Sequence, residues 1–506
     1  MSQCDAAETR VSSRWFNAHP PVAGTPMVAH PQRRLVTKIG MTFGVAKCMV
    51  APNQNTGAIM AISLAEGQIF RGLFGDSELS VLFSDSAEVR AMLLVEGALA
   101  SAQGKLGTIP QESGEIINRM AREVLIDPGH LAAGVARDGV VVPALVAAFA
   151  TEMQAPEHSA YLHKGATSQD IIDTALVLRL RRVLDILDTR LAGLLDTLAE
   201  QADTYKSTPM GARTRHQIAT PTALGARIAG WGAPFLRHRQ RLAELRPRLL
   251  VVSLAGAAGN LSAFEGRGLE TADALAEELG LGRAELPWHS ARDGICELAN
   301  LCGLICGSLG KIAQDLLLSA QIGEGLRAGT GGGSSTMPHK DNPTGAEAML
   351  SLARQGQGLA AQVAGAALHA QERDGAAWSQ EWLSLPSLIV ATGAALRHGL
   401  ELSKFLSVEP DKLAAVFEDT KGLMMAEAAS FALAAHMPLA DARTLTKSAC
   451  AKAVQSGEPL REVIARETML AIDWDAVFDA QSALGESSAI VARFCEAVAR
   501  QRVESA

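Results

Sequence analysis

The chain has 506 residues, which exceeds one ordinary domain, although an elongated helical architecture can enclose one continuous core at this length. Apolar residues make up 48% and aromatic residues only 4%, a composition that suits long helices packed through small side chains. The net charge of -8 gives no reason to expect nucleic acid as a partner, and a polyanionic substrate would need a local cluster of cations.

The seven cysteines are scattered and contain no CxxC pair, which is typical of a reducing cytosol, and no spacing indicates a metal site. Cys302 and Cys306 share a helical face, where we expect them to pack as small apolar side chains. No apolar run reaches the roughly 18 residues that a membrane helix requires. We therefore expect a soluble, cytoplasmic protein without a metal site.

The first 65 residues differ from the rest of the chain. No acidic residue lies between Glu8 and Glu66, whereas basic residues recur through this segment. A basic, acid-poor beginning can be a transit peptide, but the amphipathic period of such a peptide is missing. We interpret residues 1–65 as a disordered extension and favour a misassigned start, with Met60 as a candidate initiator.

Helical periodicity follows this extension. The predicted helices cover residues 87–103, with Ser84 and Ser86 as cap candidates, and residues 172–198, 298–316, 359–375 and 387–406. No convincing strand is visible. The pattern predicts an all-α fold with an antiparallel bundle. We divide it into an N-terminal helical domain (66–170), a central bundle (171–420) and a C-terminal helical domain (421–506).

A polar segment, HKGATSQD at residues 163–170, precedes the stripe at 172–198. Thr167 or Ser168 can cap the helix, and the helix dipole favours Asp170 in its first turn. Free N–H groups and hydroxyls at a helix start form a natural carboxylate site. A plain cap would leave the histidine and the glutamine of this segment without a role.

The most informative segment spans residues 329–347. Its glycines and serines permit a loop that closes over a ligand, and Pro338 and Pro343 stiffen the turn that carries Lys340 and Asn342. A cation and an amide on such a turn suit an anionic substrate. The glycine tract alone would equally fit a flexible linker, and the spacing to Lys340 excludes a Walker A loop.

Residues 333–343, GSSTMPHKDNP, resemble the signature GSSxMPxKxNP of the fumarase/aspartase superfamily at every fixed position. This resemblance implies an elongated all-α lyase-superfamily fold and β-elimination, or its reverse, next to a carboxylate without a cofactor. It also implies a homotetramer whose sites combine loops from three subunits. By analogy we assign Ser334 as the base; the substrate-binding residues would be Met337, Lys340 and Asn342.

Two upstream segments are similar to further motifs of the superfamily. Residues 163–170 look like its Thr-Ser-x-Asp substrate loop, which implies a catalytic His163. Residues 211–221, GARTRHQIATP, resemble its Arg-Thr-His-x-Gln segment. The substrate-binding residues implied by these two segments are Thr167, Ser168, Gln169, Thr214, Arg215 and Gln217.

The second of these segments departs from the superfamily pattern. Fumarases and adenylosuccinate lyases have a histidine where this chain has Arg215, and on a helix His216 would face about 100° away from it. In those relatives the histidine pairs with a glutamate that corresponds to Glu347. We therefore hypothesise a supporting Arg215–Glu347 ion pair, against the alternative that both side chains face solvent.

The missing histidine favours one branch of the superfamily. Expelling an amine or hydroxide benefits from a proton donor, whereas a carboxylate, with a pKa of about 4, leaves unaided. Losing the donor is therefore tolerable for a cycloisomerase, and Arg215 would bind an extra carboxylate. Residues 72–77, 288–293 and 369–382 also resemble the bacterial 3-carboxy-cis,cis-muconate cycloisomerases. In these blocks Arg292 and Arg373 either line the pocket or form structural pairs.

The resemblance covers about residues 70–460 and implies lactonisation of 3-carboxy-cis,cis-muconate in aromatic catabolism. Two alternatives stay open, an adenylosuccinate-lyase-type C–N lyase and a non-catalytic helical scaffold. Intact Ser334, Lys340 and Asn342 count against the scaffold. We expect a small polycarboxylate substrate, and neither nucleic acid nor a membrane as a partner.

Overall fold

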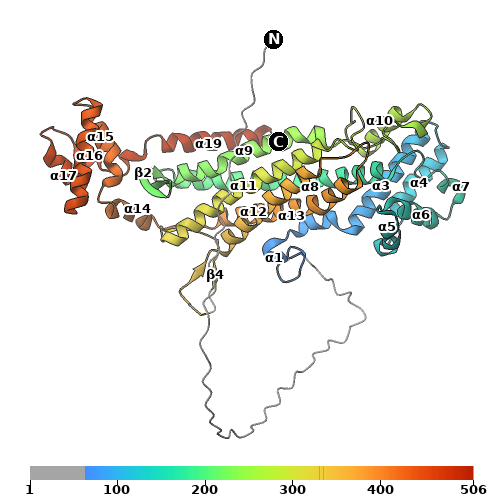
Figure 1. Cartoon of the computed structure of the whole chain (residues 1–506), viewed down its shortest axis with the longest axis horizontal. Helices are drawn as coiled ribbons and strands as arrows, with labels where there is room; N and C mark the ends of the chain where they lie inside the picture. The colour runs from blue at the N-terminus through green and yellow to red at the C-terminus, as the bar shows by residue number, and fades with distance from the viewer. Residues whose placement is uncertain (1–62, 330, 334–335, 505–506) are drawn as a thin grey trace, which may run out of the picture. The chain divides into compact units, whose positions relative to one another are not determined.

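The computed structural model describes residues 63–329, 331–333 and 336–504. Of the two compact units of the chain, residues 1–59 and 60–506, the described residues belong to the second. The predicted extension, residues 1–65, lies almost wholly outside them, as does the candidate base Ser334. The described chain is mostly helical, which confirms the predicted fold class (Figure 1).

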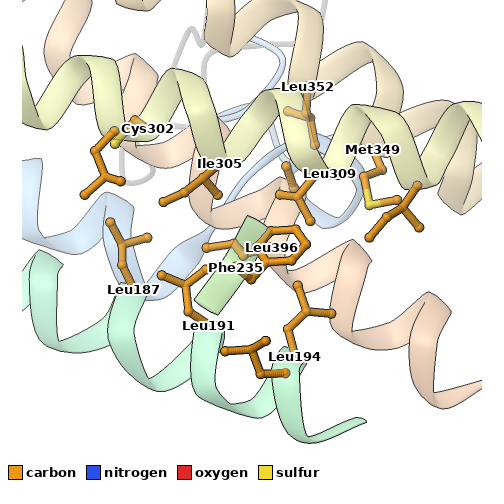
Figure 2. Close-up of a cluster of buried hydrophobic side chains, with 14 of the residues drawn as sticks. Leu187, Leu191, Leu194, Phe235, Cys302, Ile305, Leu309, Met349, Leu352 and Leu396 are labelled. Atoms are coloured by element: carbon orange, nitrogen blue, oxygen red, sulfur yellow. The ribbon is translucent and has the colours of Figure 1, made fainter. Parts of the chain in front are cut away.

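Five long helices supply the main hydrophobic core. They are α8 (Ser168–Thr204), α9 (Leu224–Leu249), α11 (Asp293–Ile322), α12 (Thr344–Gly365) and α13 (Gly375–Lys404). Figure 2 shows Leu191 of α8, Phe235 of α9, Ile305 of α11, Leu352 of α12 and Leu396 of α13 meeting in one cluster. The stripes predicted over 172–198 and 298–316 therefore lie within α8 and α11, as periodicity indicated.

A second core lies beneath the helices that precede α8. Ser84 caps α3 by accepting a hydrogen bond from Ala87 N at 3.3 Å, which confirms one predicted cap. The elements before α8, and those between α9 and α11, are α1 (Arg71–Phe74), α2 (Ser77–Ser80), η1 (Val81–Phe83), α3 (Asp85–Lys105), α4 (Gln111–Glu123), η2 (Pro128–Leu131), α5 (Ala132–Asp138), α6 (Val142–Met153), α7 (Pro156–Ser159), η3 (Ser262–Phe264) and α10 (Gly268–Leu279).

The C-terminal elements form a small third hydrophobic cluster, after which the chain runs back to the main core. The last helix packs on α8 and α9, so it joins the main core and not the cluster that precedes it. In chain order the elements are α14 (Pro410–Asp419), η4 (Leu423–Met425), α15 (Ala426–Ala434), α16 (Leu439–Ser456), α17 (Leu460–Glu467), α18 (Trp474–Val477), η5 (Ser482–Leu484) and α19 (Ser487–Glu504).

The expectation that the chain has no strand is wrong. The described residues contain three short antiparallel pairs: β1 (Pro209–Thr214) with β2 (Gln217–Ala223), β3 (Leu326–Ala328) with β6 (Leu406–Val408), and β4 (Gly332–Gly333) with β5 (Asp341–Asn342). We call the β1–β2 pair the hairpin. Its two-residue turn has positive φ at Arg215 and His216, 49° and 66°, where glycine or asparagine usually marks such a turn in a sequence.

The helix predicted over residues 359–375 is also wrong in its bounds. α12 begins at Thr344 and ends at Gly365, and residues 366–374 form turns before α13. Asp374 starts α13 by accepting hydrogen bonds from Ala376 N and Ala377 N. The break was hidden because alanine is common on both sides of it, so the apolar pattern continues across the turn.

Helix α11 is the helix in the described chain whose length and mean hydropathy would allow it to cross a membrane. Its apolar stripe, which includes Ile305 and Leu309, is buried in the main core instead. Cys302 and Cys306 are buried on the same helix, as predicted, and burial raises the pKa of the Cys302 thiol to about 12. These two thiols therefore serve packing rather than redox chemistry.

Candidate active site

The candidate residues form two groups, one at each end of α8. The segment 163–167, which we call the His163 loop, directly precedes the first residue of α8, and the hairpin follows the last. A helix of 37 residues is about 55 Å long. Figure 1 shows α7, next to the His163 loop, at one end and β2 at the other. In one protomer, therefore, His163 and Arg215 cannot contact the same small substrate.

The segment 329–343, which we call the signature loop, lies at the hairpin end. Arg213 of β1 donates a hydrogen bond to Glu324 Oε1 at 3.2 Å, just before this loop begins. Glu324 is buried and also lies 3.9 Å from Arg227. These ion pairs fasten the hairpin to the base of the signature loop, so Lys340 and Asn342 are separated from His163 by the length of the bundle helices.

The His163 loop rests on α3. His163 has φ of 57°, and its Nδ1 lies 2.7 Å from Oε1 of the buried Glu96. Gln103, two turns further along α3, donates a hydrogen bond to Lys164 O at 2.8 Å. At the next residue, Gly165 has φ of 80° and lies against the Phe264 ring, where a Cβ would be crowded. The backbone of this loop is therefore held in one conformation by its neighbours.

Asp170 joins the same loop to the rest of the protein. The helix begins at Ser168 with Thr167 as its N-cap, as predicted, and the buried Asp170 carboxylate accepts a hydrogen bond from Thr167 N at 2.9 Å. It also accepts hydrogen bonds from Ala255 N at 2.7 Å, Gly256 N at 3.1 Å and His289 Nε2 at 2.8 Å. Four donors on one buried carboxylate make Asp170 an anchor for the helix start.

The protonation of His163 is set by two opposing effects. Burial lowers the pKa of His163, but the hydrogen bond and charge of Glu96, with the charge of Asp170, outweigh it and raise the pKa above the ordinary histidine value. The side chain is 22% exposed, and Nε2 has no hydrogen-bond partner among the described residues. His163 thus presents a free nitrogen to the surface of the loop. Thr167 and Ser168 beside it are half-buried.

Gln169, another candidate at this end, is fully buried. The Gln169 amide donates hydrogen bonds to Asp173 Oδ2 at 3.1 Å and His289 O at 2.8 Å, and it accepts one from Arg373 Nε at 2.9 Å. Both its amide nitrogen and its oxygen pair with interior groups, so Gln169 holds a structural position in this protomer, and its role in substrate binding stays a prediction. For Gln169 to contact a substrate, the start of α8 would have to rearrange.

Arg292 also makes structural pairs. The buried guanidinium donates to Asp173 Oδ2 at 2.7 Å and to Glu381 Oε1 at 2.6 Å, and it lies 4.9 Å from the centre of the Trp288 ring. Burial raises the pKa of Glu381, and the neighbouring Arg292 opposes that rise. Of the two sequence alternatives for Arg292, the structural pair is the one observed. Arg373, which contacts Gln169, belongs to the same network.

The hairpin presents its candidates to solvent. Thr214, Arg215 and Gln217 are exposed around the turn. Because they lie on a β-turn, the expected helical angle between Arg215 and His216 is wrong. The hypothesised Arg215–Glu347 ion pair is not formed within the described protomer, and Glu347 is also exposed. Solvent exposure of both, the stated alternative, is what the protomer shows.

The signature loop closes on itself through β4 and β5. Gly331 has φ of 68°, and a Cβ there would overlap the Asp341 carboxylate; a Cβ on Gly332 would also clash, less severely, with Thr344. Lys340 N donates to Met337 O at 3.0 Å in the intervening turn. Met337 and Lys340 are exposed, and Asn342 is half-buried. Gly331 and Gly332 are therefore required by the close approach of their neighbours Asp341 and Thr344.

The sequence analysis did not single out Glu96, His289 or Glu324, which hold these segments in place. Glu96 carried one usable signal, since it is the single charged residue in the run 91–104. A lone carboxylate within an apolar helix is a candidate for a specific partner. The partner itself, 67 positions later in the chain, could not be read from that signal.

The family model described as Lyase matches residues 74–358. The chain belongs to the fumarase/aspartase lyase superfamily. It is 39% identical to 3-carboxy-cis,cis-muconate cycloisomerase of Pseudomonas aeruginosa over 437 residues, covering 84% of this chain and 95% of the relative. It is 34% identical to N-acetyl-S-(2-succino)cysteine lyase of Dickeya dadantii over 378 residues, covering 74% and 82%.

A solved structure of a superfamily member is also similar. The 3-carboxy-cis,cis-muconate lactonizing enzyme of Pseudomonas putida aligns with a TM-score of 0.80 and 35% identity, over 86% of this chain and 99% of that protein. The chain is therefore a superfamily enzyme that resembles the cycloisomerases, as the sequence motifs indicated.

Proposed function

We propose that this superfamily member is a 3-carboxy-cis,cis-muconate cycloisomerase. The observation that carries the proposal is Arg215, exposed at the hairpin tip where other branches have a histidine. A guanidinium can bind a third carboxylate but cannot donate a proton to a leaving group at neutral pH. Lactonisation tolerates this exchange because the attacking group is the substrate's own carboxylate. The names of the similar cycloisomerases support the same choice.

The proposed reaction forms one C–O bond and one C–H bond while one π bond breaks. A substrate carboxylate oxygen adds to the carbon–carbon double bond, the pair moves to the carbon next to another carboxylate, and that carbon takes up a proton. Ser334, the base in the elimination direction, would in the lactonisation direction donate its hydroxyl proton to this carbon. Lys340 and Arg215 would neutralise the carboxylates, and Asn342 would bind a carboxylate oxygen.

The proposed site draws on several protomers of a homotetramer. About 55 Å of helix separates His163 from the hairpin, so one protomer can contribute only one half of any site. In a symmetric assembly, a neighbour that places its hairpin end beside the His163 end would complete the site. The exposed Thr214, Arg215, Gln217 and Lys340 are then available to face the half-buried His163, Thr167 and Ser168 of another copy.

The assay for the reaction follows ultraviolet absorbance after purified protein is mixed with 3-carboxymuconate, adenylosuccinate or N-acetyl-S-(2-succino)cysteine, without added metal. Loss of muconate absorbance with formation of the lactone is the expected result. Turnover of either other substrate instead would favour a C–N or C–S lyase, for which His163 with its raised pKa would be the proton donor. No change with any substrate would favour the scaffold.

Mixed assemblies test the sharing of sites. The variants His163→Asn and Ser334→Ala should each be inactive alone, and co-expressed chains should regain activity at sites that receive both intact residues from different copies. With random mixing, about a quarter of the sites would do so. Recovery of no activity in hybrid tetramers verified by native mass spectrometry would show that the two residues do not act in a shared site.

A further inference from the structure

Glu96 is a buried carboxylate with one partner. It is 1% exposed, its Oε1 lies 2.7 Å from His163 Nδ1, and its Oε2 has no hydrogen-bond partner among the described residues. Asp170, another buried carboxylate of this region, has four donors and anchors two segments. Burial of a carboxylate is costly, and Glu96 does not recover that cost through a structural network. Its contact with His163 is therefore the feature that needs an explanation.

We infer that Glu96 is a positioning residue that turns His163 into a proton-transferring group of the site; this inference rests on the proposed function. With Nδ1–H donated to Glu96, the imidazole has a fixed orientation and leaves Nε2 for exchange. The positive φ of His163 and the bonds of α3 to the loop hold the ring over the carboxylate. The loop thereby offers one nitrogen in one orientation.

The charge of Glu96 decides between two roles for His163. A histidine that only bound a substrate carboxylate would be weakened by a buried carboxylate in contact with it, because the pair is neutral overall. Lys340 and Arg215 are better suited to that task as permanent cations. A histidine that gives up and regains a proton gains from the same neighbour, which stabilises the protonated form and fixes the tautomer.

Among the charged groups around His163, Glu96 is the one whose charge can be removed without breaking the bonds that anchor the loop. Asp170 of α8 also stabilises the imidazolium, but it is occupied by His289 and three backbone donors. Lys164, next in the loop, directs its Nζ to Thr108 O at 2.9 Å and lies 3.3 Å from Glu265. Removing the charge of Glu96 therefore changes His163 while the anchoring bonds of the loop stay in place.

The proposed reaction consumes one proton, which His163 can supply. Addition of the carboxylate to the double bond leaves an electron pair on carbon, and closing the lactone consumes one proton. In our scheme Nε2–H of His163 returns a proton to the Ser334 oxygen after Ser334 has protonated the carbon, and the partly exposed ring regains its proton from solvent. Atoms and electrons balance without any co-reactant.

The test compares Glu96→Gln with the wild-type protein. Glutamine keeps the size and an oxygen that accepts from Nδ1–H but removes the charge. NMR of ring-labelled histidine, with His163→Gln to assign the signal, should show the titration midpoint of His163 moving down by about one unit or more. Because the protonated form supplies the proton, the alkaline fall of kcat/KM for lactonisation should move to lower pH by the same amount.

Two controls keep the test decisive. Glu88→Gln alters a half-buried glutamate on the same helix, near Arg179, and should leave the His163 midpoint unchanged. Glu96→Asp retains the charge and should give a midpoint between those of the wild type and Glu96→Gln; it also serves if the glutamine variant does not fold.

The outcomes separate the inference from the proposed function. An unchanged His163 midpoint in Glu96→Gln overturns the inference, whatever the substrate is. A shifted midpoint with an unshifted rate profile overturns proton transfer by His163. The NMR measurement needs no substrate, so failure of muconate turnover affects only the proposed function, and the rate profile is then recorded with the substrate that is turned over.

Discussion

At the His163 end of α8, buried side chains tie the loop to α3, to residues 255–256 and to His289. At the other end, Met337 and Lys340 of the signature loop and the hairpin tip are exposed, and Gly331 and Gly332 allow close contacts with Asp341 and Thr344. One end is thus held by buried hydrogen bonds, whereas the described candidates at the other end are exposed. Substitutions should therefore cost stability at the first end and activity at the second.

The largest effect is expected at the signature loop. Ser334→Ala should lower kcat by about 10²- to 10⁴-fold, because the proposed base is lost, while the thermal unfolding midpoint stays the same. Steady-state kinetics and calorimetry measure the two quantities. Ser335→Ala is the matched control, with a much smaller loss. Unchanged turnover in Ser334→Ala would remove Ser334 as the base.

At the rigid end, Arg292→Met should lower the free energy of unfolding by about 3–5 kcal/mol, since Asp173 and Glu381 would remain buried without their cation. Denaturant unfolding measures the loss. Arg283→Met, which removes an exposed guanidinium 3.0 Å from Asp273, should change it by less than about 1 kcal/mol. Equal effects in both variants would contradict the distinction between the two ends.

How far the sequence reaches depends on whether a feature is encoded locally. The stripe along α8, its Thr167 cap and the signature motif are local patterns, so the sequence predicted them. The hairpin was missed because Arg215 and His216 adopt positive φ without the usual turn residues. The Glu96–His163 contact was missed because it joins residues 67 positions apart, a distance that no local pattern encodes.

A smaller effect on binding is expected at the hairpin tip. Arg215→Ala should raise KM for the tricarboxylate by about 10- to 100-fold with a smaller change in kcat, because a charged hydrogen bond is worth about 1.5–3 kcal/mol. Initial rates over a range of substrate concentrations separate the two constants. His216→Ala, at the adjoining turn position, should leave KM nearly unchanged. A fall in kcat alone would argue that Arg215 takes part in chemistry rather than in binding.

The smallest effect is expected from the backbone of the signature loop. Gly331→Ala should reduce kcat/KM by about tenfold, because alanine at positive φ costs roughly 1–2 kcal/mol and its Cβ meets Asp341. The unfolding midpoint should not move, since the loop lies outside the cores. Gly333→Ala, where an added Cβ meets no atom within 4 Å, is the matched control. A lower midpoint in Gly331→Ala would show that this loop supports the fold.

The length of α8 has a consequence for how such a protein can be regulated. A monomer would fold around its own cores yet carry two unfinished half-sites, so activity would report on assembly. Dilution below the dissociation constant of the oligomer should abolish turnover without unfolding any chain, and a competitor for the contact surface would act as an inhibitor without entering the site. Selection on such a chain would preserve its contacts with its own copies as strictly as its chemistry.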